Sequence, residues 1–190
     1  MRTLAITQNV TLDGRVEMLG DWFAPQAQGD ADNGDLLEEN RRQDAAADAL
    51  LVGRRTFEDL RGYWRDLEGD TTGISEYLDG VRKHVVSVTL DEPAWEGTDV
   101  LRPSGADDLV AQVRRLKEAD GRDVVCTGSI TLCHALVVAD LVDEFRLFTY
   151  PVVQGAGRRL FPDGYEASGL RLAEATAFRS GIGYQRWVRR

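Results

Sequence analysis

Short apolar segments alternate with longer, mixed segments along this chain of 190 residues. An apolar run of about four to eight residues between turn residues is typical of a strand buried on both faces, whereas apolar residues spaced three or four apart are typical of a helix. The sequence thus predicts strands over residues 4–10, 49–52, 84–90, 99–101, 123–127, 143–150, 170–179 and 182–189. It predicts helices over residues 35–48, from 56 onward, over 106–119 and from 128 to about 139.

The order of these elements decides the fold class. A helix between two strands makes a crossover connection, which places the strands parallel, whereas the turn at residues 180–183 joins the last two strands as a hairpin. The predicted fold is therefore α/β, with a mixed, mostly parallel sheet flanked by helices and ending in an antiparallel β-hairpin. The sequence contains no internal repeat and no linker, so we expect a single domain over residues 1–190.

Two polar stretches fall between the predicted elements. Residues 20–35 are rich in Gly, Asp, Pro and Gln, which indicates a surface loop with Trp22 and Phe23 as its large anchors. Residues 65–80 are also polar, and we expect them to be irregular or partly helical.

The charge of the chain narrows the classes of partner. A formal net charge of −9 and a pI near 4.8 describe a surface that repels phosphate backbones, so nucleic-acid binding is not expected.

The start of the chain is too short and polar for a signal peptide, and no apolar run is long enough to span a membrane, so we expect a cytoplasmic protein without a membrane partner.

The cysteines and histidines do not have the spacing of a metal site, so no metal is expected. Cys126 and Cys133 are interpreted as small buried apolar residues.

Two predicted strand-to-helix junctions stand out as candidate anion sites. Gly53-Arg54-Arg55-Thr56 follows one apolar strand, and Thr127-Gly128-Ser129 follows another. A helix N-terminus offers unpaired N–H groups and partial positive charge, glycine permits close approach, and arginine adds a fork of donors for phosphate. Two such junctions in one sheet would hold the two ends of a dinucleotide. Thr56 and the carboxylate of Asp59 also resemble a capping box, which predicts a helix start at Thr56.

Other motifs give less support for a phosphate ligand. Any α/β domain has glycines at strand–helix turns, so a structural role of these residues remains an alternative. Gly155-Ala156-Gly157 does not lie in the strand–helix context of a dinucleotide fingerprint, and the sequence has no phosphate-binding loop of the nucleotide triphosphatases.

Several segments in the right order carry a family resemblance. Ala49–Glu58 runs from an apolar strand through Gly-Arg to Thr, an aromatic residue and Glu, and it resembles the corresponding signature of dihydrofolate reductases. Val125–Ser129 is similar to their second glycine-bearing cofactor turn. Leu141–Phe161, Thr11–Gly14 and Tyr184–Trp187 resemble dihydrofolate-reductase-like proteins and the reductase domains of the riboflavin pathway. The resemblance therefore implies a dihydrofolate-reductase-like fold over nearly the whole chain.

The resemblance also implies NADPH as the cofactor. By the family pattern, the cofactor-binding residues would be Gly53, Arg54, Arg55, Thr56, Ser87, Thr89, Thr127, Gly128, Ser129 and Ile130. Ser87 and Thr89 would lie near the 2′-phosphate, for which the arginine pair would also provide guanidinium groups.

The function implied is hydride transfer from NADPH to a small heterocyclic, pterin-like or aminopyrimidine-like substrate. The position that holds the substrate-binding acid in dihydrofolate reductases falls near Leu37, so Asp35 is our first candidate for the proton donor and Glu38 the second. Both flank that position, as Glu39 does, and water is the alternative donor. Trp22 and Phe23 are candidates for covering the substrate ring, or for anchoring the loop.

Two alternative functions remain open at this point. One is the 5-amino-6-(5-phosphoribosylamino)uracil reductase activity of the riboflavin pathway, for which Arg158 and Arg159 would hold the substrate phosphate. The other is a nucleotide-binding protein without turnover. Related folds in this group are often dimers, so a homodimer is among the expectations.

Overall fold

The computed structural model describes residues 1–23 and 32–190. Within these residues the strands are β1 (Leu4–Thr11), β2 (Ala47–Gly53), β3 (Arg82–Val86), β4 (Thr98–Leu101), β5 (Asp123–Thr127), β6 (Glu144–Tyr150), β7 (Leu170–Ala177) and β8 (Gly183–Arg189). The helices are α1 (Gly34–Ala46), α2 (Arg54–Trp64), α3 (Ile74–Gly80), α4 (Ala106–Glu118) and α5 (Ile130–Val138).

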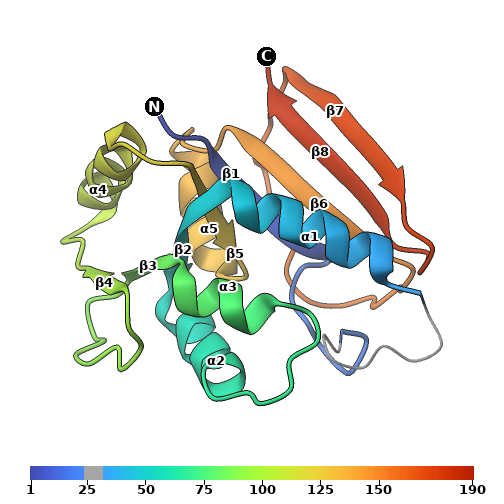
Figure 1. Cartoon of the computed structure of the whole chain (residues 1–190). Helices are drawn as coiled ribbons and strands as arrows, with labels where there is room; N and C mark the ends of the chain where they lie inside the picture. The colour runs from blue at the N-terminus through green and yellow to red at the C-terminus, as the bar shows by residue number, and fades with distance from the viewer. Residues whose placement is uncertain (24–31) are drawn as a thin grey trace.

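All of these strands join one sheet in the order β4-β3-β2-β5-β1-β6-β8-β7 (Figure 1). The pairs from β4 across to β6 are parallel, and β8 is antiparallel to both β6 and β7. The predicted mixed, mostly parallel sheet with a terminal hairpin is confirmed. No helix among the described residues has the length and apolar character needed to cross a bilayer.

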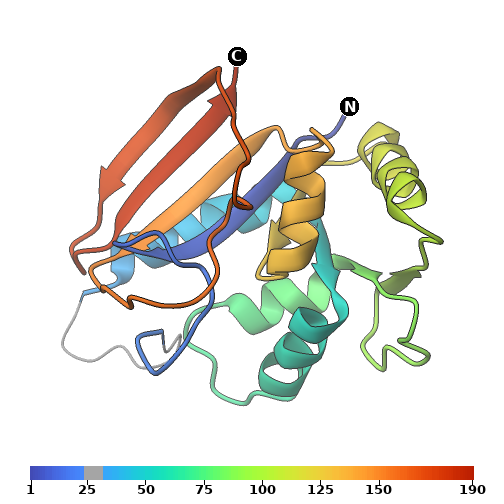
Figure 2. The same cartoon turned by 180° about the vertical axis from the view of Figure 1, so that it is seen from behind.

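Helices cover both faces of the sheet because successive side chains of a buried strand point to opposite faces. In β2, Ala49 and Leu51 belong to the core under α4 and α5, whereas Leu50 and Val52 belong to the core under α2 and α3. Helix α1 lies across β1 and β6 on the side of α2 and α3 (Figure 1), and α5 covers the opposite face (Figure 2). Buried β2 is therefore apolar throughout its middle, as its sequence indicates.

The two cysteines lie in the core on the α5 side. Cys126 in β5 and Cys133 in α5 are fully buried and not joined by a disulfide. Their interpretation as small buried residues is confirmed.

Two elements end earlier than the sequence predicts. Strand β3 stops at Val86 rather than at residue 90, because the Ser87 hydroxyl accepts hydrogen bonds from the N–H groups of Thr89 and Leu90 and closes a turn. Helix α1 stops at Ala46, and β2 begins at Ala47 with a register shift before Ala49. Part of the stretch 65–80 forms α3, whereas residues 24–31 of the predicted loop lie outside the described residues.

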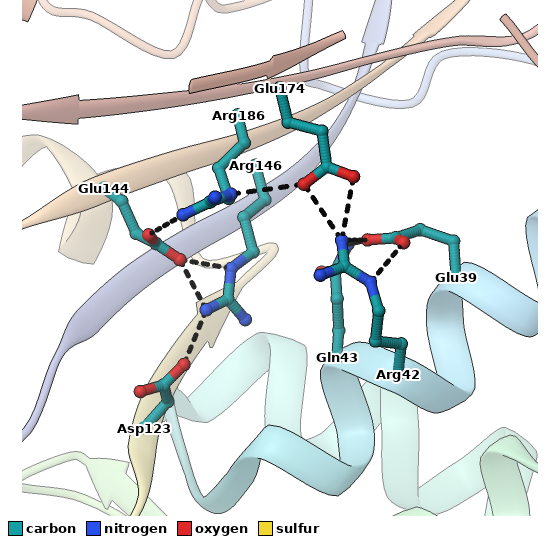
Figure 3. Close-up of polar contacts among 8 residues, drawn as sticks. All are labelled: Glu39, Arg42, Gln43, Asp123, Glu144, Arg146, Glu174 and Arg186. Atoms are coloured by element: carbon teal, nitrogen blue, oxygen red, sulfur yellow. Dashed lines mark hydrogen bonds and ion pairs between the residues drawn. The ribbon is translucent and has the colours of Figure 1, made fainter. Parts of the chain in front are cut away.

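A network of charges, buried at Arg146 and Glu144 and more exposed toward Arg42, joins α1 to the sheet (Figure 3). Arg146 in β6 is 5 % exposed, and its guanidinium donates to Glu144 Oε1 and, at 2.6 Å, to Asp123 Oδ2. Glu144 also pairs with Arg186 at 3.2 Å, and Glu174 in β7 joins Arg186 to Arg42 in α1. The network continues along α1 from Arg42 to Glu39 and Gln43.

Within this network Arg146 is the closest cationic partner of Glu144, which has Arg186 as its second partner at 3.2 Å. Removing one partner of a buried ion pair leaves the other charge without compensation, which costs more than the pair itself contributes. Because Glu144 is 6 % exposed, water cannot readily replace the closer of its two guanidinium partners.

We therefore expect Arg146→Ala to lower the free energy of unfolding by about 3–5 kcal/mol, measured by urea denaturation. Arg171→Ala is the control, because Arg171 is exposed on β7 and makes no ion pair with the described residues. The control is expected to change stability by less than about 0.5 kcal/mol. A similar small change for Arg146→Ala would contradict the role of the network.

Candidate active site

A cleft of about 1410 Å³ opens at the carboxyl ends of the central strands. Its lining includes Thr7 to Asn9 of β1, Gly53 at the end of β2, Thr127 at the end of β5 and Phe148 in β6. Helix α1 forms another wall through Leu37 and its neighbours. In open α/β sheets this edge is where ligands bind, since loops and helix N-termini meet there.

The two predicted junctions lie side by side and hold each other in place. The Gly53 N–H donates to the Ser129 hydroxyl at 2.8 Å, and the Ser129 N–H donates to the Thr56 hydroxyl at 2.8 Å. Each junction thus supplies a side-chain acceptor for a backbone donor of the other. Both junctions line the cleft, through Gly53, Arg54, Arg55 and Thr56 on one side and Thr127, Gly128, Ser129 and Ile130 on the other.

The turn after β5 needs glycine at position 128. Gly128 has φ +55°, and a Cβ built on it would lie 2.7 Å from Thr56 Cγ2. Ser129 also has positive φ, at +45°, which is uncommon for a residue with a side chain and is offset here by its two hydrogen bonds. The buried side-chain amide of Gln8 in β1 donates to the Gly128 carbonyl at 2.6 Å, so a residue of β1 also holds the turn in place.

The helices at these junctions begin without side-chain caps. Helix α2 starts at Arg54, and α5 starts at Ile130 after Ser129. The predicted capping box is wrong, because the Thr56 hydroxyl accepts from Ser129 across the junction rather than from its own helix. The first-turn N–H groups of α2 and α5 consequently have no side-chain partner at the cleft.

The cationic side chains of the cleft differ in their partners. Arg54 pairs with Glu58 one turn later in α2, at 3.2 Å. Arg158 pairs with Glu17, at 2.7 Å. Arg55 lines the cleft without an ion pair to any residue that the structure describes. The prediction gave Arg54 and Arg55 equal roles, whereas the geometry leaves Arg55 as the unpaired charge.

Ser87 and Thr89 do not line the cleft. Register pairs Val86 with Gly53, so Ser87 follows β3 beside the first junction, but its hydroxyl is engaged in the turn that ends the strand. Arg159 is also outside the lining, and its carbonyl lies 2.9 Å from His134 Nε2. The predicted roles of Ser87 and Thr89 at a 2′-phosphate remain predictions.

An aromatic wall, formed by Trp22, Phe23 and Tyr150, lines another part of the cleft. The ring centroids lie 6.2 Å apart for Trp22–Phe23, 5.2 Å for Trp22–Tyr150 and 5.9 Å for Phe23–Tyr150, all in edge-to-face geometry. Trp22 Nε1 donates to the Gln154 side-chain oxygen at 2.7 Å. Tyr150 was missed in the sequence, where it reads only as the last residue of a strand.

Asp44 is a cleft residue that the sequence reasoning did not single out. It lies on α1 seven residues after Leu37, so the two share one face of the helix and both line the cleft. Burial raises the pKa of Asp44 to about 6. Tyr77 also lines the cleft, and burial and then the charge of Asp44 raise its pKa, so the hydroxyl stays protonated.

The two predicted proton donors lie elsewhere. Asp35 and Glu38 line a separate shallow groove of about 280 Å³ with Glu39 and Arg42, on the side of α1 that faces β7. The Asp35 carboxylate accepts from the Arg179 N–H at 3.0 Å, and this hydrogen bond lowers the pKa of Asp35. The physical reason is helix periodicity, because residues 35 and 38 share a face that points away from the face of Leu37 and Asp44. The geometry therefore makes Asp44 the candidate proton donor in place of Asp35 and Glu38.

The chain belongs to the RibD C-terminal domain family, whose model matches residues 2–184. It is 30 % identical over 189 residues to the uncharacterized protein YyaP of Bacillus subtilis, covering 95 % of this chain and 92 % of that protein. The resemblance predicted from the sequence is thereby confirmed at the level of the family.

Three solved bacterial structures illustrate the similarity of fold. A putative riboflavin biosynthesis protein from Shewanella matches with a TM-score of 0.66 at 16 % identity, covering 99 % of both chains. A pyrimidine reductase-like protein from Corynebacterium diphtheriae matches with 0.68 at 15 % identity, covering 100 % of this chain and 92 % of the other. A diaminohydroxyphosphoribosylaminopyrimidine deaminase/5-amino-6-(5-phosphoribosylamino)uracil reductase from Thermotoga maritima matches with 0.65 at 14 % identity, and this chain spans 57 % of its length. These similarities confirm the dihydrofolate-reductase-like fold.

The geometry of the turn gives a direct test. Gly128→Ala places a methyl group against Thr56 at positive φ, so we expect it to lower the free energy of unfolding by about 1–3 kcal/mol in urea denaturation. Gly62→Ala is the matched control, because Gly62 lies inside α2 with nothing within 4 Å of the added Cβ. The control is expected to raise stability slightly, since alanine favours helix. Equal effects at both positions would contradict this account.

Proposed function

We propose that this protein is an NADPH-dependent reductase that transfers a hydride to a small heterocyclic substrate. One observation carries the proposal: two uncapped helix N-termini, locked together by Ser129, line one cleft with the unpaired guanidinium of Arg55. Two N-termini and a guanidinium suit a ligand with several phosphates. Membership of the RibD C-terminal domain family and the similarity of fold to a pyrimidine reductase-like protein and to a deaminase/uracil reductase support a reductase role.

The residues present fit the cofactor at two places. Gly53 to Thr56 and Thr127 to Ile130 would hold it through backbone N–H groups, and Arg55 would add a charge for a phosphate. When bound, NADPH supplies the hydride. The remaining tasks fall to the chain itself, which must hold a flat ring in place, exclude water and hold a proton.

Asp44 is the residue in the cleft best suited to hold that proton. A carboxyl group with a pKa of about 6 is protonated in roughly one molecule in ten at pH 7, far more often than an ordinary aspartic acid. Tyr77 would orient the substrate with its protonated hydroxyl. The aromatic wall of Trp22, Phe23 and Tyr150 would pack against the substrate ring.

The uracil reductase of the riboflavin pathway is a second candidate, favoured by the description of the Thermotoga maritima protein. A binding protein without turnover is the third, and the presence of Asp44 in the cleft favours an enzyme over it. The expected homodimer and cytoplasmic location remain predictions.

Cofactor binding is tested by calorimetry with NADPH and NADH. We expect NADPH to bind more tightly than NADH, and Arg55→Ala to weaken NADPH binding by about tenfold or more, because it removes the unpaired guanidinium. Arg54→Ala is the matched comparison, since Arg54 is already paired with Glu58 and should matter less. Failure of the wild type to bind either nucleotide would refute the reductase.

The pH dependence of turnover tests Asp44. If protonated Asp44 supplies the proton, kcat/KM for substrate reduction falls about tenfold per pH unit above pH 6. Asp44→Asn is expected to lower kcat/KM about 100-fold at pH 6 and to abolish this dependence. Asp35→Asn is the comparison, because the assignment made from sequence predicts the loss there instead.

Stability gives a second measurement on the same variant. The raised pKa of Asp44 means that its contribution to stability is present below its ordinary pKa near 4 and is lost as pH rises through about 6. Urea denaturation should therefore show Asp44→Asn gaining stability relative to wild type between pH 4 and pH 8. A constant difference would contradict the pKa shift.

A further inference from the structure

Arg158 is the cationic residue in the cleft most completely neutralised by a neighbour. Glu17 Oε1 accepts from Arg158 Nε at 2.9 Å and from Nη2 at 2.7 Å, and Glu17 Oε2 accepts from the Arg158 N–H at 3.1 Å. Glu17 thus occupies the fork of donors that would grip a phosphate, together with a backbone donor.

Neighbouring groups hold the Glu17 side of the pair, whereas the Arg158 side chain is 48 % exposed. The Gln154 amide donates to the Glu17 carbonyl at 2.9 Å and to the Ala156 carbonyl at 2.7 Å, and Gln154 also accepts from Trp22. A Cβ built on Gly157 would lie 2.9 Å from this amide and 3.3 Å from Glu17 Cβ, so the two segments are in close contact. A ligand phosphate would have to displace Glu17 to bind the Nε and Nη2 edge of Arg158, whereas Nη1 contacts only the Thr131 hydroxyl, at 3.4 Å, among the described residues.

Arg55 is the other guanidinium that could take the place of Arg158 among the described residues of the cleft. Arg54 is paired with Glu58, and Arg55, whose charge also acts on Glu17, is assigned to the proposed cofactor. The part of the cleft under α1 has the carboxyl group of Asp44 and the aromatic wall, and no cationic side chain of α1 lines it. A phosphate there would meet a carboxylate without a guanidinium, which is unfavourable in a partly buried site.

We propose that the substrate of this protein is a planar heterocycle, neutral or cationic, that carries no phosphate, and that Glu17 determines this specificity by neutralising Arg158. The inference rests on the proposed reductase function and refines it. It separates this chain from a reductase whose substrate is held by a phosphate, despite the shared fold. Arg158 is then a structural partner of Glu17 and not a substrate-binding residue.

Paired ligands that differ only in the phosphate provide the test. The protein is saturated with NADP⁺, so that no hydride donor is present, and titrated in a calorimeter with 5-amino-6-(5-phosphoribosylamino)uracil and with the same nucleoside lacking the phosphate. The unphosphorylated compound is expected to bind at least tenfold more tightly. Equal or tighter binding of the phosphorylated compound, or no binding of either, overturns the proposal. Absence of NADP⁺ binding refutes the reductase function itself, which keeps the two failures distinct.

Three variants assign the preference to Glu17. Glu17→Gln frees Arg158, so the preference should fall at least fivefold through a gain by the phosphorylated compound. Glu58→Gln is the matched control, because it frees Arg54 with the same change in charge and should leave the preference within twofold. The double variant Glu17→Gln/Arg158→Ala removes both charges and should return the preference to within twofold of wild type; a preference that stays at the Glu17→Gln level would show that Arg158 is not the group that Glu17 neutralises and overturn the proposal.

Discussion

The exchange of hydrogen bonds among Gly53, Ser129 and Thr56 is the constraint on which the cleft depends. Neighbouring strands β2 and β5 end at the same edge of the sheet, but pairing of strands alone does not fix how the following helices begin. Ser129 does so by accepting from one junction and donating to it, at 2.8 Å in each case. Because the hydroxyl of Thr56 is used in this way, the N-termini of both helices remain open toward the cleft.

The charged groups of the molecule have two kinds of role: some stabilise the packing of α1 on the sheet, and others line the cleft. Arg146 and Arg186 stabilise the contact of α1 with the sheet, where burial makes each charge depend on its partner (Figure 3). In the cleft, Glu58 and Glu17 occupy Arg54 and Arg158. An acidic chain with several arginine pairs therefore offers one unpaired guanidinium at the cleft among the described residues.

Much of the fold could be predicted because β-strands buried on both faces leave a clear pattern. The run from Ala49 to Val52 marks the strand that has helices on both sides, and the glycine-bearing turns mark where the cleft forms. The site was predictable where it consists of backbone and nearby side chains. The position of Asp44 was not, because the face that α1 turns to the cleft is set by tertiary packing, and residues 35 and 44 differ in face although both are aspartates of one helix.

The ion pair of Glu17 and Arg158 could not be predicted from the sequence for a related reason. The two residues are 141 positions apart, and nothing local to either indicates that they meet. A basic pair in a sequence resembles a phosphate site until the structure reveals what neutralises it. The same limit applies to Thr56, whose spacing to Asp59 suggested a cap while its partner came from the other junction.

The place of β1 in the sheet has a consequence for how the protein assembles. Strand β1 pairs with β5, 120 residues later in the chain, and with β6, 139 residues later. It can join the sheet only after these strands are available, and loop closures of this length slow folding. Gln8, which supports the Gly128 turn, arrives with that strand. The cleft is therefore completed late in folding, and an incomplete chain has no partial version of the site.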